Sequence, residues 1–165
     1  MAKVGMTVMR RTGGFTLVEL VTVVTIIGIL AALAVPSLRQ LYLTQQIRGA
    51  AAELQTSLYY ARSEAVKRAA DVQVVPTSND WAQGWTVQLA SGGTVLRKQS
   101  ALSDQLSSAS GSTLTYRNDG RLSGGTVTVT FKTPTTSIPS RCVIVDLSGR
   151  PAVVYAGDSA SDSCS

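Results

Sequence analysis

The chain contains no histidine among its 165 residues. It therefore lacks the side chain most often used for general acid–base catalysis and a frequent zinc ligand. The sequence also has no Gly-x-Ser-x-Gly motif, no P-loop and no cluster of carboxylates. Serines are plentiful, but there is no histidine to activate one. We therefore expect neither an enzyme nor a bound metal or cofactor, and activity in a soluble fragment starting near Arg39 would contradict this.

Charge is almost absent from residues 15–35, where Glu19 is the one charged side chain. Upstream lie Lys3, Arg10 and Arg11 and no acid. A helix of this length is roughly 31 Å long, close to the ~30 Å hydrocarbon core of a bilayer. We expect it to span a membrane with the cations on the cytoplasmic side. Glu19 needs its own explanation, since a carboxylate in a spanning helix costs on the order of 2.5–3.5 kcal/mol.

Three interpretations of this stretch compete. An ordinary secretory signal would be cleaved after Ala32-Leu33-Ala34, but it would carry an acid in its apolar region. A simple membrane anchor leaves Glu19 unexplained. Gly14-Phe15-Thr16-Leu17-Val18-Glu19-Leu20, after a short basic leader, resembles the class III signal of type IV pilins and of the pseudopilins of type II secretion. The resemblance implies that a prepilin peptidase cuts between Gly14 and Phe15 and methylates the new amino terminus.

The same resemblance implies a role for Glu19 in filament assembly. Its carboxylate would pair with the Phe15 amine of a neighbouring subunit and set the axial register more than it adds stability. The implied partners are other pilins or pseudopilins, the prepilin peptidase and the inner membrane. The protein would cross that membrane once, with a periplasmic C-terminal domain, before it enters a pilus or pseudopilus.

A helical period continues beyond Pro36. Apolar residues recur along one stripe: Leu38, Leu41, Ile47, Ala51, Leu54, Leu58, Ala61, Ala65 and Ala69. Glu64 and Arg68 have the i,i+4 spacing of a favourable ion pair. After the leader at 1–14, we expect one helix from Phe15 to about Ala70, with a membrane or filament-core half at 15–36 and an amphipathic half at 37–70.

From residue 71 the period becomes two and β-branched residues dominate. We expect an α+β, pilin-like subunit in which the long helix packs on an antiparallel β domain at 71–165. Ser-rich residues 103–112 are interpreted as a mobile loop. Seven strands are predicted, at 72–75, 84–89, 94–96, 113–116, 126–131, 142–145 and 152–155.

Further stretches resemble the GspH/FimT-type minor pilins. They are Tyr60–Arg68, Trp81-Ala82-Gln83-Gly84-Trp85, Arg141-Cys142-Val143, Leu147-Ser148-Gly149-Arg150-Pro151 and Cys164. Taken without the resemblance, the tryptophans indicate core residues and the basic residues of 60–68 a solvated helix face. The resemblance implies a FimT-type minor pilin of a type IV pilus. The alternative is a GspH-type minor pseudopilin of a type II secretion system.

Some FimT-type proteins bind DNA for uptake in natural transformation, through a Gly-Arg-x-Arg pattern in a carboxyl-terminal loop. This chain has Gly149-Arg150-Pro151-Ala152, without the second arginine. We expect double-stranded DNA, if it is a partner, to contact the loop around Gly149 and Arg150 through its phosphates, without sequence preference and with steep salt dependence. Further candidate contacts are Arg97, Lys98, Arg117 and Arg121.

The two cysteines, Cys142 and Cys164, lie beyond the membrane segment, where an oxidising periplasm permits a disulfide. We predict that they pair and pin the carboxyl tail to the last strands. The bond is also expected to hold the Gly149 loop in place. Removing Lys3, Arg10 and Arg11 with the leader leaves 12 cations against 10 acids, so the +5 charge of the whole chain is weak evidence for DNA.

Overall fold

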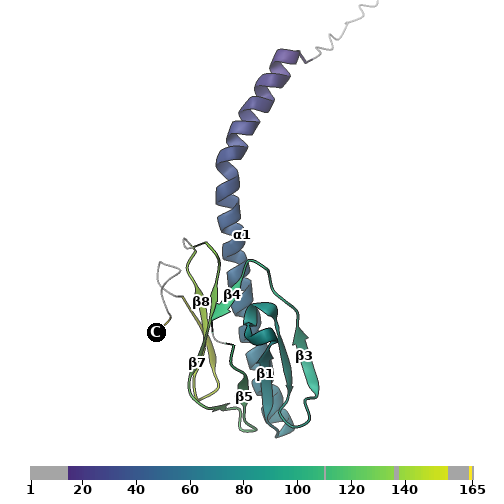
Figure 1. The fold of residues 1–165 in the computed structure, drawn as a ribbon, viewed down its shortest axis with the longest axis vertical. Helices are drawn as coiled ribbons and strands as arrows, with labels where there is room; N and C mark the ends of the chain where they lie inside the picture. Colours follow the sequence, from purple (N-terminus) through teal and green to yellow (C-terminus); the bar gives the residue numbers. More distant parts are fainter. Residues whose placement is uncertain (1–14, 110, 136–137, 156–163, 165) are drawn as a thin grey trace, which may run out of the picture. The chain divides into compact units, whose positions relative to one another are not determined.

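The computed structural model describes residues 15–109, 111–135, 138–155 and 164 (Figure 1). The leader at 1–14, and with it Gly14, lies outside these residues. The described chain is one helix, α1 (Leu17–Arg68), followed by antiparallel strands and two short 3-10 turns at Thr77–Asn79 and Trp81–Gln83. It divides into two compact units, residues 1–39 and residues 40–165. The predicted α+β class, with one long helix and an antiparallel β domain, is confirmed.

In the first unit, α1 begins after Thr16 and continues through Pro36. The Thr16 hydroxyl accepts a hydrogen bond from the backbone N–H of Glu19 at 3.2 Å, which caps the first turn. The hydroxyls of Thr22 and Thr25 donate to carbonyls one turn earlier, at 2.7–3.0 Å. Such bonds satisfy polar groups inside an apolar segment.

In the second unit, α1 buries a stripe of apolar residues, most of them three or four positions apart: Leu43, Ile47, Ala50, Ala51, Leu54, Leu58, Ala61 and Ala65. The predicted stripe is right from Ile47 to Ala65. It is wrong at Leu38, Leu41 and Ala69, whose side chains are exposed. The apolar period of the sequence continues beyond the part of the helix that the β domain covers. Periodicity alone therefore could not show at which helix residue burial begins or ends.

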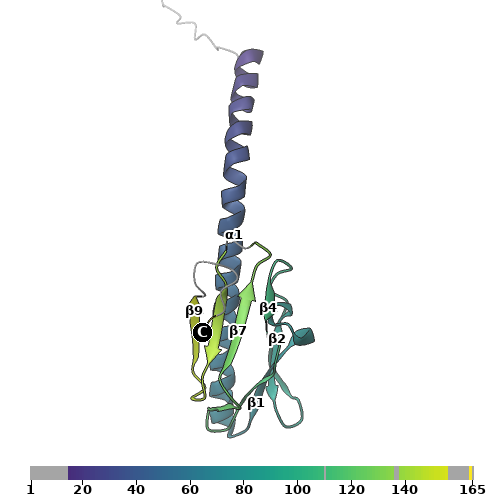
Figure 2. The same ribbon diagram turned by 60° about the vertical axis from the view of Figure 1, so that its left-hand side comes forward.

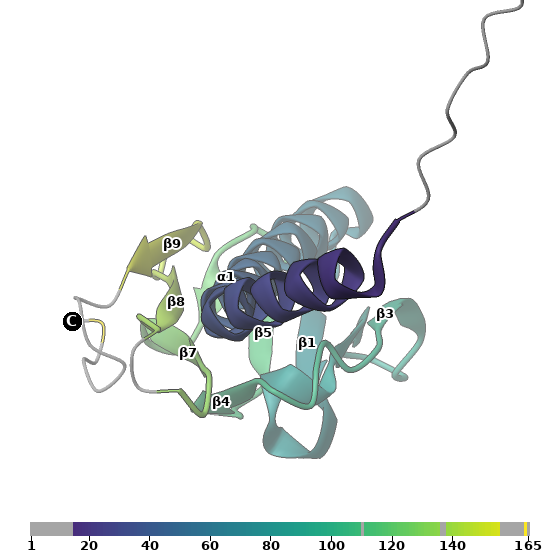
Figure 3. The same ribbon diagram turned by 90° about the horizontal axis from the view of Figure 1, so that it is seen from above.

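The strands form two sheets around the second part of α1, as Figures 2 and 3 show. The first has the order β3-β2-β1-β5-β6 and contains β1 (Val72–Pro76), β2 (Trp85–Leu89), β3 (Val95–Gln99), β5 (Leu114–Tyr116) and β6 (Leu122–Ser123). The second has the order β4-β7-β8-β9 and contains β4 (Ser107–Ala109), β7 (Val127–Lys132), β8 (Arg141–Val145) and β9 (Pro151–Tyr155). All neighbouring strands are antiparallel.

All seven predicted strands are present, and the structure adds β4 and β6. The interpretation of 103–112 as a mobile loop is wrong at β4, which pairs with β7 in the register Ser107↔Lys132. Asp80 explains this, because one of its carboxylate oxygens accepts hydrogen bonds from the Ser108 N–H at 3.1 Å and from the Ser108 hydroxyl at 2.7 Å. A tertiary contact therefore orders a segment with weak strand propensity.

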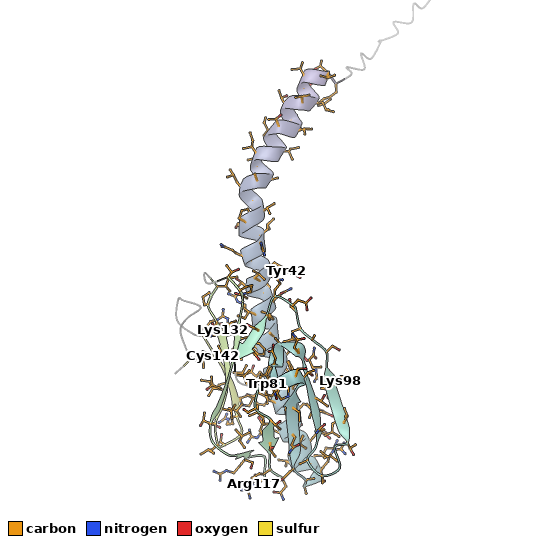
Figure 4. All side chains as sticks on the ribbon, viewed as in Figure 1. Tyr42, Trp81, Lys98, Arg117, Lys132 and Cys142 are labelled. Atoms are coloured by element: carbon orange, nitrogen blue, oxygen red, sulfur yellow. A yellow bond between two sulfur atoms is a disulfide. The ribbon has the colours of Figure 1, made fainter. Side chains whose placement is uncertain are left out.

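The core lies between the helix stripe and the two sheets. Trp81 and Trp85 are fully buried there, with ring centroids 6.2 Å apart, and Figure 4 shows Trp81 inside the domain. Their interpretation as core residues is confirmed. Every buried side chain of the described chain lies at Leu43 or beyond, so the second unit contains its own complete core.

Candidate functional site

The first candidate site is the apolar part of α1. All side chains from Phe15 to Tyr42 are exposed. This segment is also the one described helix that is long and apolar enough to cross a membrane, with a mean hydropathy of 2.6 over its most apolar window. Its Glu19 carboxylate makes no hydrogen bond or ion pair with another described residue. An apolar surface of this size needs lipid or other helices to cover it.

The second candidate site is formed by two turns at one end of the second unit. Gly149 has a φ of +76°, and a Cβ there would lie 2.2 Å from the carbonyl oxygen of Gly120. The N–H of Leu122 donates to the Leu147 carbonyl at 3.3 Å. The turns at 117–122 and 146–149 therefore hold each other in close contact, and glycine at 149 is what permits it.

This contact brings together several predicted DNA-contact residues. Arg117 and Arg121 line a cavity of about 390 Å³ that also reaches Leu147. Gly149 and Arg150 belong to the facing turn. We define the arginine cluster as Arg62, Arg117, Arg121 and Arg150. None of the four forms an ion pair with another described residue.

Arg62 was not among the predicted contacts. Gly120 lies against it, since a Cβ at that glycine would be 3.4 Å from Arg62 Nε. It comes from α1, where the sequence indicates only a solvated helix face. No sequence signal could have placed it beside the turn, because residues 62 and 120 meet only through the tertiary fold.

Two carboxylates lie within the same turns and act locally. Asp119 accepts a hydrogen bond from the Arg121 N–H at 2.9 Å. Asp146 accepts from the Ser148 hydroxyl at 2.6 Å and from the Arg150 N–H at 3.3 Å. The Ser148 hydroxyl, followed by the backbone N–H of Arg150, lowers the pKa of Asp146. Both acids therefore order the turns, and four guanidinium groups outnumber them.

Arg97 and Lys98 do not join this cluster. Both are on β3, and Figure 4 shows Lys98 away from Arg117, which lies at the lower end of the domain. Arg97 Nη2 donates to Glu53 Oε1 at 2.7 Å, and its guanidinium lies 6.0 Å from the ring centroid of Tyr60. Its charge is already paired. The sequence could not reveal this, because Glu53 and Arg97 are 44 residues apart.

The predicted disulfide is present. It joins Cys142 of β8 to Cys164, with a Cα–Cα distance of 6.2 Å. It does not hold the Gly149 loop directly, because Cys142 pairs with Val154 and the turn follows the other end of the hairpin, at Val145↔Pro151. That part of the expectation is wrong. The loop is held by Asp146 and by its contact with Gly120.

Comparisons with known proteins agree with this architecture. The family model described as type II transport protein GspH matches residues 50–149, and the model of the prokaryotic N-terminal methylation motif matches residues 9–35. Among curated proteins, none matches the sequence.

Two crystal structures of the type IV minor pilin FimU of Pseudomonas aeruginosa have a similar fold, each at 24% identity. The form in space group P21 has a TM-score of 0.59 and covers 72% of this chain and 95% of its own. The form in space group P65 has a TM-score of 0.56 and covers 70% and 98%. At this identity the likeness supports the fold. Because the GspH model matches more than half of the residues, the chain belongs to the GspH family of type IV pilin-like proteins.

Proposed function

We propose that the protein is a FimT-type minor pilin of a type IV pilus. It assembles through the apolar part of α1 and binds DNA without sequence preference through the arginine cluster. The exposed apolar helix with a single carboxylate supports the filament role. The four guanidinium groups without ion pairs support the DNA role.

The filament role is supported by the groups of the first unit that have no partner among the described residues. Its apolar side chains are exposed, its threonine hydroxyls are satisfied within the helix, and Glu19 has no described partner. Cleavage after Gly14 would create a cationic amine at Phe15. A neighbouring subunit's amine is then the natural partner for Glu19, because paired charges in an apolar environment cost far less than single ones.

Mass spectrometry of the protein from membranes or sheared filaments tests this role. The mature chain should start at Phe15 and carry a methyl group on its amino terminus. A chain that starts at Val35 would show an ordinary secretory signal, and it would remove both the amine and Glu19. That result would contradict the filament role.

The arginine cluster supports the DNA role. Guanidinium groups form forked hydrogen bonds with phosphate oxygens, and the turn at Gly149 is held in place before binding. With about three phosphates neutralised, affinity should be micromolar at best and should fall about 40-fold between 50 and 200 mM salt.

A soluble fragment lacking residues 1–38 tests the DNA role, because the second unit contains its own core. Fluorescence anisotropy with duplex DNA should show that Arg150→Ala and Arg121→Ala weaken binding of every sequence alike and each reduce the salt slope by about one. Lys98→Ala, on β3, is the matched control and should change little. No binding at low salt would leave a structural minor pilin.

A GspH-type minor pseudopilin is the second candidate, favoured by the match to the family model of type II transport protein GspH. Deletion of the gene separates the two roles. Loss of transformation or twitching, with secretion intact, supports the pilus. Loss of secretion alone would contradict it and assign the chain to a secretion filament.

A further inference from the structure

A second cavity, of about 270 Å³, lies between α1 and the edge of the second sheet. Arg48 and Gln55 of α1, Arg141 of β8 and Val153 and Tyr155 of β9 line it. It is separate from the arginine cluster, which is formed by other residues. The function proposed above does not use it.

Arg141 is the unusual member of this lining. Its side chain is buried, at 5% exposure, yet its Nε and Nη1 have no hydrogen-bond partner among the described residues. A buried guanidinium without an anion is rare, because its charge and its donors are both costly to leave unpaired. The described part of the chain therefore supplies no acceptor for these two nitrogens.

The described residues around the cavity carry charge of one sign. Arg48 is a second cation beside Arg141, and none of the described lining residues is an acid. Burial lowers the pKa of Arg141, the Tyr155 hydroxyl opposes this, and the charge of Arg48 lowers it further. An arginine remains protonated under these conditions, so an anion entering the cavity would meet two positive charges.

Tyr155 covers the guanidinium, with Arg141 Cζ 3.5 Å from its ring centroid. Tyr155 as a whole residue is 68% exposed, so few other groups hold its ring in place. Ala51, Ala52 and Val153 add apolar walls that suit a short methylene stem, and the Gln55 side chain donates to the Pro151 carbonyl at 3.3 Å. A planar carboxylate on such a stem matches the forked donors of arginine.

We propose that this cavity takes the carboxylate of an aspartate or glutamate side chain from a neighbouring filament subunit, which pairs with Arg141 and Arg48. β9 is the last strand of its sheet, and no described strand pairs with its outer edge. Val154 and Tyr155 are exposed along this edge, as a surface that a neighbour covers would be. The inference rests on the filament role proposed above.

The first test uses the fragment lacking residues 1–38 and the ¹⁵N NMR signal of Arg141 Nε. A glutamate tripeptide, acetyl-Ala-Glu-Ala-amide, should shift this signal and those of the Tyr155 ring together and saturably. The glutamine tripeptide should not. Arg48→Gln should weaken binding about fivefold, as expected for loss of one partly exposed charge, and Lys98→Gln should leave it unchanged.

Three results would overturn the proposal. The glutamate peptide could leave Arg141 unaffected, or inorganic phosphate could shift its signal while the peptide does not. The peptide could also bind only after Asp158→Asn and Asp162→Asn are introduced together, which would show that the chain's own tail occupies the site.

The second test uses the full chain in cells. Arg141→Met should lower incorporation into sheared filaments several-fold, and Arg141→Lys should retain more of it, with the thermal midpoint of each fragment measured as a check on folding. If the wild-type chain is absent from filaments, the proposed function fails. If the wild type is present, the peptide does not bind and Arg141→Met incorporates equally, only the cavity assignment fails.

Discussion

At the scale of single residues, Glu19 is the one charged side chain of the apolar helix segment. Its carboxylate has no ion-pair partner among the described residues. We predict that Glu19→Ala leaves membrane insertion intact, because it removes a penalty of about 2.5–3.5 kcal/mol, yet impairs filament assembly. Immunoblots of membranes and of sheared filaments measure the two effects. Glu19→Gln separates charge from size and should fail in the same way. Wild-type incorporation of Glu19→Ala would show that the charge pair is dispensable.

Tyr116 contains a buried hydroxyl without a hydrogen-bond partner among the described residues. Because an unsatisfied buried group destabilises the fold, Tyr116→Phe should raise the free energy of unfolding by about 1 kcal/mol at neutral pH. Urea denaturation of the fragment lacking residues 1–38 measures this. Tyr59→Phe is the control, since the Tyr59 hydroxyl donates to the Pro151 carbonyl at 3.2 Å and its loss should be neutral or destabilising.

The same substitution has a consequence at high pH. Burial raises the pKa of Tyr116 above its unfolded value of about 10. The stability linked to the neutral phenol is therefore complete below pH ~10 and is lost as the pH rises from there toward the folded pKa. Tyr116→Phe should remove part of this alkaline loss. An unchanged pH profile would show that the phenol is not buried as described.

Ion pairs show which residue contacts a sequence can reveal. The spacing of Glu64 and Arg68 predicts their pairing, and Arg68 Nε lies 2.6 Å from Glu64 Oε2. Helix geometry brings residues four apart together in any context. No local rule joins Glu53 to Arg97 or places Arg62 beside Gly120, because those contacts depend on how sheets pack on the helix.

At the scale of elements, the close contact of Gly149 with Gly120 holds together the two turns of the arginine cluster. Gly149→Ala should lower the free energy of unfolding by about 2 kcal/mol, because it combines a positive φ with a Cβ 2.2 Å from the Gly120 carbonyl oxygen. It should also weaken DNA binding by separating the loops. Gly92→Ala is the matched control, with a φ of +82° and no atom within 4 Å of the added Cβ.

That control should cost about 1 kcal/mol through backbone strain alone and leave DNA binding unchanged. Thermal denaturation and anisotropy measure the two effects on the same samples. Equal losses of stability for both variants would mean that the contact between the turns contributes nothing.

The disulfide closes the β8–β9 hairpin and the tail. Replacing Cys142 and Cys164 with serine should lower the free energy of unfolding by roughly 3 kcal/mol, from loop-closure entropy. Urea denaturation of the oxidised and substituted fragments gives the difference. A thiol assay that finds two reactive cysteines in periplasmic protein would contradict the pairing.

Strands could be predicted where apolar and polar side chains alternate. They were missed where a contact with another element, and not the strand's own sequence, holds the strand in place. In β1 burial alternates residue by residue, and in β7 apolar and polar residues alternate in the sequence although burial does not. β4 consists of Ser107, Ser108 and Ala109, which have no strand preference, and it depends on Asp80 for its position. The two-residue β6 is too short to produce a period.

At the scale of the whole molecule, composition located the apolar helix and indicated a separate β domain. The structure sets the start of the second compact unit at residue 40. The sequence could not place that boundary, because the apolar period crosses it without a break. The arginine cluster was predicted in part, since turn glycines and arginines are visible in the sequence while their proximity is not.

The first unit's exposed apolar helix also determines how much work filament growth requires. Its side chains are shielded from water equally well by lipid tails and by other helices, so transfer from membrane to filament changes the hydrophobic free energy little. Polar terms, with Glu19 foremost, then decide the direction of transfer. In the filament role proposed above, the free-energy difference between a subunit in the membrane and one in the filament would then come mainly from the pairing of a single carboxylate, so the pH and salt that act on this pair would set the balance between growth and disassembly.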